Sequence, residues 1–116
     1  ETKSKNVQNM LHGGLYHIRG IIYRESNIPL FIKNFIFAAK YYSTCNGDEN
    51  LEAVLNGIQR NITSLSQSDI LNLKNKKCDL LSILSKIESN IKNESFIETI
   101  NNIRAIIYQK NIPPTE

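Results

Sequence analysis

Apolar side chains recur at steps of three and four residues along most of the chain, which is the spacing of amphipathic helices. The first such stripe covers residues 7–22, and the segment Arg24 to Asn27, followed by Pro29, ends this first helix. The stripe consists of Val7, Met10, Leu11, Gly14, Leu15, Ile18, Ile21 and Ile22. Because an apolar stripe normally faces the core, we expect it to be buried, with Gly14 where another helix approaches closely.

A second helix is expected to begin after Ser26 or Asn27, either of which can cap it, with Pro29 in its first turn. Its sequence, LFIKNFIFAAKYYSTC, is apolar on most faces, which is typical of the central helix of a bundle. The tripeptide Asn46-Gly47-Asp48 then indicates a turn.

Asp48 can cap a third helix with a regular apolar stripe and a polar back. That stripe is formed by Leu51, Val54, Leu55, Ile58 and Ile62, and Gly57 lies off it. A final helix is expected after a capping box at Ser95 and Glu98. Its apolar positions are Phe96, Ile97, Ile100, Ile103, Ile106 and Ile107.

Between these helices, Ser66 and Asp69 resemble another capping box. The apolar positions that follow step alternately by three and four residues, as in a heptad seam, and Lys77 is the one polar residue in it. Two interpretations remain, either one long helix over about 68–91 with Lys77 snorkelling, or a break at 74–77. We favour the long helix.

These patterns predict an all-α fold, a compact bundle of four to five amphipathic helices around the mostly apolar second helix. A length of 116 residues is that of a single domain. We expect residues 1–116 to form it, with 1–6 and 111–116 as frayed tails.

The composition places the chain in the globular class, with 41% hydrophobic and 22% charged residues. A net charge of +3 falls short of a nucleic-acid-binding footprint, and the one basic cluster, Lys74, Lys76 and Lys77, is either a solvated face or a binding patch. No apolar run approaches 18 residues, so no membrane span is expected. Asn, Ile and Lys make up more than a third of the chain, which indicates an AT-rich genome.

Cys45 and Cys78 form the only pair available for an intramolecular disulfide. Such a bridge would close a loop of about 34 residues and add roughly 3–4 kcal/mol of stability in the chain-entropy model. Two free buried thiols fit the spacing equally well. Glycosylation sequons begin at Asn61 and Asn93, and a chain with this composition contains about two by chance.

The stretch HGGLYHIRG, residues 12–20, holds both histidines and three of the five glycines. His12 and His17 lie five residues apart, about 140° around a helix, so they cannot ligate one metal ion from one straight helix. Gly13 and Gly20 fall on the polar back, where they are expected only to weaken the helix, by about 1 kcal/mol each. No strand precedes them, so a phosphate loop is not indicated. We interpret the stretch as an unusual helix and not as a site.

Nothing in the sequence predicts an enzyme or a cofactor. The three Asp residues fall at helix caps or turns, and no Ser, Thr or Cys has a histidine within helical reach. Tyr and Arg are enriched at binding hot spots, and the polar side of the first helix carries Tyr16, Arg19, Tyr23 and Arg24. We expect these four residues to be exposed, either as the ordinary polar surface of an amphipathic helix or as the best candidate on the chain for a patch that contacts a protein partner.

The function indicated is a non-enzymatic helical protein-interaction module. The oxidised Cys45–Cys78 pair would suit a secreted or exported effector, surface protein or cytokine-like ligand. One alternative is an intracellular, cytoplasmic adaptor or inhibitor, of the immunity-protein or viral death-antagonist type, with both thiols reduced. Another is a small carrier of lipid or other hydrophobic ligands, which would use the aromatic side chains of the second helix to line a cavity.

Overall fold

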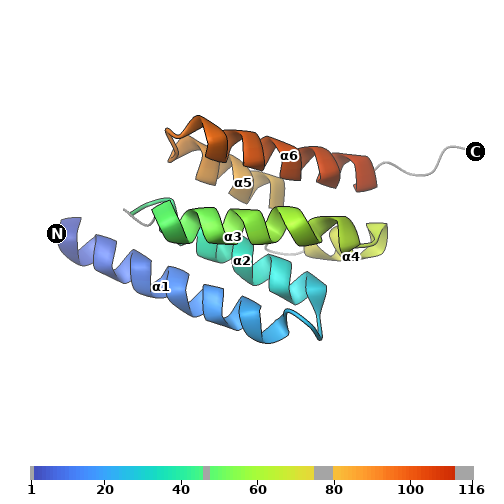
Figure 1. The fold of residues 1–116 in the computed structure, drawn as a ribbon, viewed down its shortest axis with the longest axis horizontal. Coiled ribbons are helices and arrows are strands. Elements are labelled where there is room, and N and C mark those ends of the chain that lie inside the picture. The colour runs from blue at the N-terminus through green and yellow to red at the C-terminus, as the bar shows by residue number, and fades with distance from the viewer. Residues whose placement is uncertain (1, 46–47, 75–79, 112–116) are drawn as a thin grey trace, which may run out of the picture.

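The structure, a computed structural model, describes residues 2–45, 48–74 and 80–111, and these fold as an all-α bundle (Figure 1). The prediction of the fold class is confirmed, with six α-helices in the described ranges instead of four to five. The elements are α1 (Thr2–Tyr23), α2 (Ile28–Tyr42), α3 (Asp48–Asn61), the short 3₁₀ helix η1 (Ile62–Ser64), α4 (Gln67–Lys74), α5 (Leu80–Ser89) and α6 (Glu94–Asn111).

The start of α2 is capped as the sequence predicts. The Asn27 side chain accepts a hydrogen bond from the backbone N–H of Leu30, at 3.2 Å, and Pro29 lies in the first turn. A proline is tolerated there because the first N–H groups of a helix have no partner within the helix. The loop between α1 and α2 is therefore short and defined by local chemistry.

Two later helix starts also use side-chain caps. Before α4, the backbone N–H of Ser66 donates to Asp69 at 3.1 Å, while that of Asp69 donates to the Ser66 hydroxyl at 3.0 Å, which confirms the capping box. At α6 the cap is Asn93, two positions before the predicted box at Ser95 and Glu98. Its side-chain oxygen accepts from the backbone N–H of Ser95 at 2.9 Å and from the Ser95 hydroxyl at 2.8 Å.

The prediction of one long helix over 68–91 is wrong. α4 and α5 are separate helices in different parts of the fold (Figure 1). A single straight helix would place Lys77 in the same seam as Leu80 and Leu84, both of which are fully buried. Ile70 of α4 and Leu80 of α5 are both fully buried in the core. Residues 75–79, including Lys77, lie outside the described residues.

α2 is the central helix, as predicted, and packs against α1, α3, α4 and α5. Its Ile32, Ile36, Ala38 and Ala39 are fully buried. The predicted stripe of α3 is also buried, and the core continues into α5 and α6. At the far side of the core, Arg104 of α6 pairs with Glu88 of α5 at 2.6 Å. This arrangement leaves α1 to a different role.

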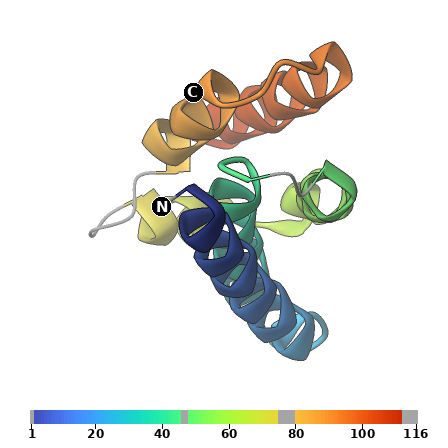
Figure 2. The same ribbon diagram turned by 90° about the vertical axis from the view of Figure 1, so that its left-hand side faces the viewer.

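α1 forms an outer layer that packs mainly on α2. It lies at one edge of the molecule, and α5 and α6 lie at the opposite edge (Figures 1 and 2). The helix begins at Thr2, so residues 2–6 are helical and not the frayed tail that the sequence suggested. Because one side of α1 rests on α2, its opposite side is open to solvent.

Candidate protein-interaction surface

The apolar stripe of α1 faces away from the bundle, contrary to the prediction that it would be buried. Its six large aliphatic side chains have half or more of their surface exposed, up to 70% for Ile22. We call these residues the α1 face: Val7, Leu11, Leu15, Ile18, Ile21 and Ile22. Burial of such side chains normally stabilises a fold, so an exposed set of six on one helix indicates a contact surface.

The side of α1 that packs on α2 is built around two glycines. A Cβ at Gly13 would lie 2.6 Å from Cε1 of Tyr42, and a Cβ at Gly20 would overlap the ring of Phe35. Both glycines are buried. At Gly14, by contrast, a Cβ would have nothing within 4 Å. The expected roles are therefore reversed, because Gly13 and Gly20 allow the close approach and Gly14 lies on the open side.

The ring of Phe35 fills space between three helices. It lies against Gly20 of α1, while on its other side a Cβ at Gly57 of α3 would come within 2.7 Å of Cε2. Its centroid is 4.5 Å from that of Phe31. Phe35 thus keeps 6% of its surface exposed and holds α1 and α3 at fixed distances from α2. This role of Gly57 was not predicted, because Gly57 lies off the apolar stripe of its helix.

Aromatic rings line the same interface nearer the α1 N-terminus. His12 stacks on Tyr41 with ring centroids 5.1 Å apart. Tyr16 stacks on Tyr41 at 5.7 Å and contacts Phe37 at 5.3 Å. These rings account for most of the stretch HGGLYHIRG, since Gly13, Gly20 and the rings face α2 together. The interpretation that it is a structural helix segment agrees with this packing.

His17 lies on the opposite side of this interface from His12. Its Nδ1 is 3.1 Å from the Tyr42 hydroxyl, and its ring meets Phe35 edge-on at 5.1 Å. Burial lowers the pKa of His17 below 6.5, because the charged imidazolium loses hydration. Burial also raises the pKa of Tyr42, with a smaller coulombic contribution from Cys45, so its hydroxyl stays protonated at neutral pH.

This environment of His17 predicts a pH-dependent stability. The unfolded chain takes up a proton on His17 near pH 6.5, whereas the folded protein takes it up only at lower pH. The contribution of neutral His17 is therefore complete above about pH 6.5 and decreases as the pH falls below it. Urea unfolding at about pH 7.5 and about pH 5.5 should show this loss, and His17→Gln should reduce it. An equal loss in His17→Gln would assign the effect to other groups.

The four residues expected to form a partner-binding patch differ in how far they are exposed to solvent. Tyr16 is half-buried against α2, which corrects the expectation that it is exposed. Arg19, Tyr23 and Arg24 are exposed. The Arg19 guanidinium lies over the Tyr16 ring, 5.5 Å from its centroid. Arg19 therefore borders the α1 face, and Tyr16 supports it from beneath.

Charge is distributed unevenly along the chain. Residues 1–44 contain six of the 14 basic and two of the 11 acidic residues, a net charge of +4, whereas the remainder carries −1. Neither α1 nor α2 contains an Asp or a Glu. Arg19 lies over Tyr16, and the Lys40 ammonium of α2 lies 5.8 Å from the centroid of the Tyr41 ring, on which Tyr16 stacks. The α1 face thus has a basic border.

The other predicted modification and basic residues lie elsewhere. Asn61 is half-buried at the end of α3, where its amide donates to the Gly57 carbonyl at 2.8 Å. Asn93 is exposed, and its side chain caps α6. Lys74 is the last residue of α4, and Lys76 and Lys77 lie outside the described residues. The use of the two sequons and the binding role of the basic cluster stay predictions.

The disulfide is also untested. Cys45 is half-buried after α2, and its thiol donates to the backbone carbonyls of Tyr41 and Tyr42 at 3.5 and 3.6 Å. Cys78 lies outside the described residues. The predicted Cys45–Cys78 pair therefore stays a prediction.

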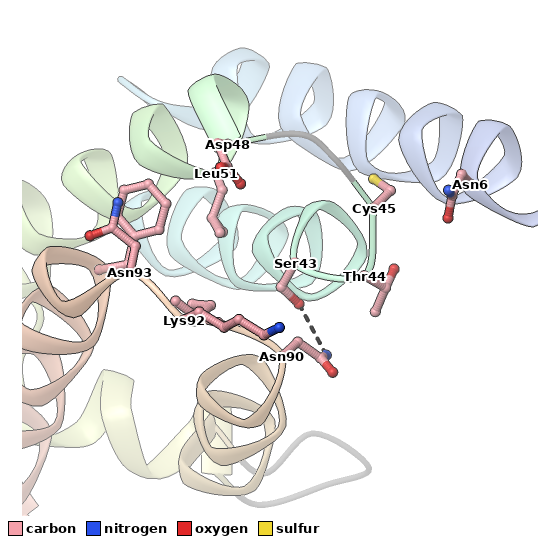
Figure 3. Close-up of a pocket in the computed structure, with 11 residues that line it drawn as sticks. Asn6, Ser43, Thr44, Cys45, Asp48, Leu51, Asn90, Lys92 and Asn93 are labelled. Atoms are coloured by element: carbon pink, nitrogen blue, oxygen red, sulfur yellow. Dashed lines mark hydrogen bonds between the residues drawn. The ribbon is translucent and has the colours of Figure 1, made fainter. Parts of the chain in front are cut away.

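A cleft of about 590 Å³ opens between the end of α2, the start of α3 and the loop before α6 (Figure 3). Its walls are mainly polar and include Thr44, Asp48, Lys92 and Asn93. A second cleft, beside Ile21, holds about 210 Å³, which is below the roughly 300–1,000 Å³ of usual ligand pockets. Neither cleft has the large apolar lining that a lipid carrier needs.

Over the described ranges, no group of three or more His, Cys, Asp and Glu residues could hold a metal ion. His12 and His17 contact different rings on α2 and do not meet. None of the described helices is both long and apolar enough to cross a membrane. No protein-family model and no curated protein matches the sequence, and no solved structure matches the chain.

Proposed function

We propose that this protein is a non-enzymatic helical interaction module that binds a protein partner through the α1 face. The observation that carries the proposal is the exposure of six aliphatic side chains, each half or more uncovered, on one side of one helix. The other side of the same helix is fixed to α2 by buried glycines and rings. The helix is therefore held in place while its apolar surface remains available.

The extent of the α1 face fits a contact between proteins. The largest apolar patch on a typical monomer covers roughly 300–600 Å², and such patches are often functional. The α1 face runs from Val7 to Ile22, four turns of a helix, and is bordered by exposed polar residues such as Gln8 and Arg19. An apolar centre with a polar rim is the usual organisation of an interface.

The shape of α1 determines the kind of contact. Leu11, Leu15, Ile18 and Ile22 follow one another at steps of four, three and four residues, which is the anchor spacing of a helix that binds in a groove or against another helix. Because the fold already holds α1 as a helix, binding does not require the ordering of a disordered segment. The conformational entropy lost on association is correspondingly small.

We further propose that the module acts as a secreted or exported effector, surface protein or cytokine-like ligand. This part of the proposal depends on the Cys45–Cys78 pair, because disulfides persist in oxidising compartments. A cytoplasmic adaptor or inhibitor with reduced cysteines is the alternative, and the α1 face would bind a partner in the same way in either location.

The proposal predicts that one charge in the centre of the α1 face will weaken partner binding. Ile18 is 59% exposed, so Ile18→Glu should leave the fold intact and place a carboxylate in the apolar contact. We expect binding to weaken about tenfold, equivalent to about 1.4 kcal/mol. The partner would be captured from the native source, purified, and titrated against both forms by calorimetry.

Tyr108→Glu provides the matched control, because Tyr108 is 54% exposed on α6, at the opposite edge of the molecule. This variant should bind as tightly as the wild type does. If every purified partner binds Ile18→Glu and wild type equally, the α1 face is not the binding surface and the proposal fails.

A further inference from the structure

We infer that the α1 face binds an amphipathic helix that carries acidic residues along one edge and a bulky apolar side chain opposite Gly14. This inference rests on the proposed function and specifies the partner of the same surface. Three features of the molecule carry it: the spacing of the face, the open position at Gly14, and the basic border.

The centre line of the α1 face has the spacing of a helix–helix seam. Val7, Leu11, Gly14, Ile18 and Ile21 alternate between steps of four and three residues. This alternation keeps successive side chains on one line along a helix, where they meet a second helix that lies alongside. The seam covers two heptads and has Gly14 at its midpoint.

Gly14 repeats, on the open side of α1, the device that the fold uses on the buried side. Gly13 receives the ring of Tyr42, and Gly20 receives the ring of Phe35. Gly14 lies in the middle of an apolar seam, and nothing within 4 Å would contact its Cβ. Because glycine weakens a helix by about 1 kcal/mol, its position here is consistent with a contact that a larger residue would prevent. We assign this space to a bulky side chain of the partner.

The basic border of the face is supported by stacked rings. Arg19 lies over Tyr16, Tyr16 stacks on Tyr41, and Lys40 lies over Tyr41. Cations held against aromatic faces lose part of their freedom in advance, so a carboxylate that pairs with them imposes a smaller entropic cost. A partner helix lying along the seam would place its own flanking residues next to this border.

The charges of α1 and α2 help to distinguish among three possible binding partners of the α1 face: a second copy of this chain, an anionic membrane and an acidic helix. A second copy of this chain would bring a further set of cations and, from the same two helices, no carboxylate. An anionic membrane would satisfy the charges and accept an aliphatic face, but fluid lipid chains offer no fixed side chain to fill the open position at Gly14. An acidic helix satisfies the charges and also fills the space at Gly14.

Two synthetic peptides test the inference. The first has three heptads with Leu along its seam, one Phe at the central seam position and Glu at the flanking positions, and the second has Lys in place of every Glu. We expect the acidic peptide to bind about tenfold more tightly at low ionic strength, because carboxylates meet Arg19 and Lys40. Arg19→Glu should remove most of that preference, and Lys86→Glu, an exposed change on α5, should preserve it.

Gly14→Leu tests the space opposite the bulky side chain. A Cβ at Gly14 would have nothing within 4 Å, so this variant should fold. Because leucine would occupy the space meant for the partner's bulky side chain, the variant should bind the Phe-containing acidic peptide about tenfold more weakly. A peptide with Ala in place of Phe should lose little of its affinity for Gly14→Leu. If both peptides lose the same affinity, no side chain enters at Gly14 and the inference is overturned.

The inference would also be overturned if the acidic and basic peptides bind equally well, or if neither peptide binds. Stable dimers of the free protein in sedimentation experiments would overturn it as well, because a second copy would then cover the α1 face. The protein can also be tested for flotation with vesicles of phosphatidylcholine and about one-third phosphatidylserine. If the wild type floats with the vesicles and Ile18→Glu does not, the α1 face binds a membrane and the inference is overturned. These outcomes are distinguishable from failure of the proposed function, because that proposal is tested on the native partner. If the native partner binds Ile18→Glu more weakly but contains no acidic helix, the proposed function holds and the inference about the partner fails.

Discussion

Phe35→Ala is expected to lower the free energy of unfolding by about 3–5 kcal/mol, the usual cost of removing a buried phenylalanine. The ring is 6% exposed and lies between Gly20 of α1 and Gly57 of α3. Neither glycine has a side chain that could move into the space left behind, so the cavity cannot collapse without movement of a whole helix. The predicted loss is therefore near the upper end of this range.

Urea unfolding followed by circular dichroism measures this loss, and Phe37→Ala is the matched control. Phe37 lies two residues away on the same helix, is half-buried, and contacts Tyr16 at the border of the interface. Its removal should cost clearly less than that of Phe35. An equal or smaller loss for Phe35→Ala would show that Phe35 does not connect the three helices.

The second large effect is expected from one substitution at two glycines of the same helix. Gly20→Leu should destabilise the protein by roughly 3 kcal/mol, because the new side chain would overlap the Phe35 ring in a closely packed interface. Gly14→Leu should raise the free energy of unfolding by up to about 1 kcal/mol, because leucine favours the helix and meets open space.

The opposite signs make this pair a test of how α1 is oriented. Both variants add the same side chain to the same helix, and they differ only in the face that receives it. Thermal and urea unfolding of the two proteins would decide the question directly. A destabilised Gly14→Leu together with an unaffected Gly20→Leu would mean that α1 packs through its aliphatic stripe after all.

Local chemistry explains which parts of the fold were predictable. The cap at Asn27, the reciprocal bonds of Ser66 and Asp69, and the buried stripe of α3 depend on residues within a few positions of one another. Such signals determine where helices begin and which residues share a side. They do not determine which side of a helix meets another helix.

The orientation of α1 depends on a competition that local patterns do not describe. Its aliphatic stripe and its glycine side could each have packed on α2. The glycine side is the one that accommodates the large rings of α2, including Phe35 and Tyr42. One signal was present in the sequence, since Gly13 and Gly20 are seven residues apart and therefore lie within about 20° of each other around the helix. With His12, Tyr16 and His17 nearby, this pattern indicates a helix surface shaped to receive rings.

The candidate site was only partly predictable for the same reason. Arg19, Tyr23 and Arg24 are exposed as expected, but Tyr16 is half-buried against Tyr41 and Phe37. The larger surface, the α1 face, was assigned to the core. Hydrophobic periodicity identified its residues correctly, but burial depends on the shape of the facing helix.

The position of Phe35 between two glycines has a consequence for how this sequence can change over evolutionary time. A larger residue at Gly20 or Gly57 fits only if position 35 becomes smaller, and a smaller residue at 35 is tolerated only if a neighbouring glycine is filled. Descendants of a common ancestor should therefore keep the three residues together or replace them together. Such linked changes would mark lineages that retain this three-helix junction, even where the rest of the sequence has diverged.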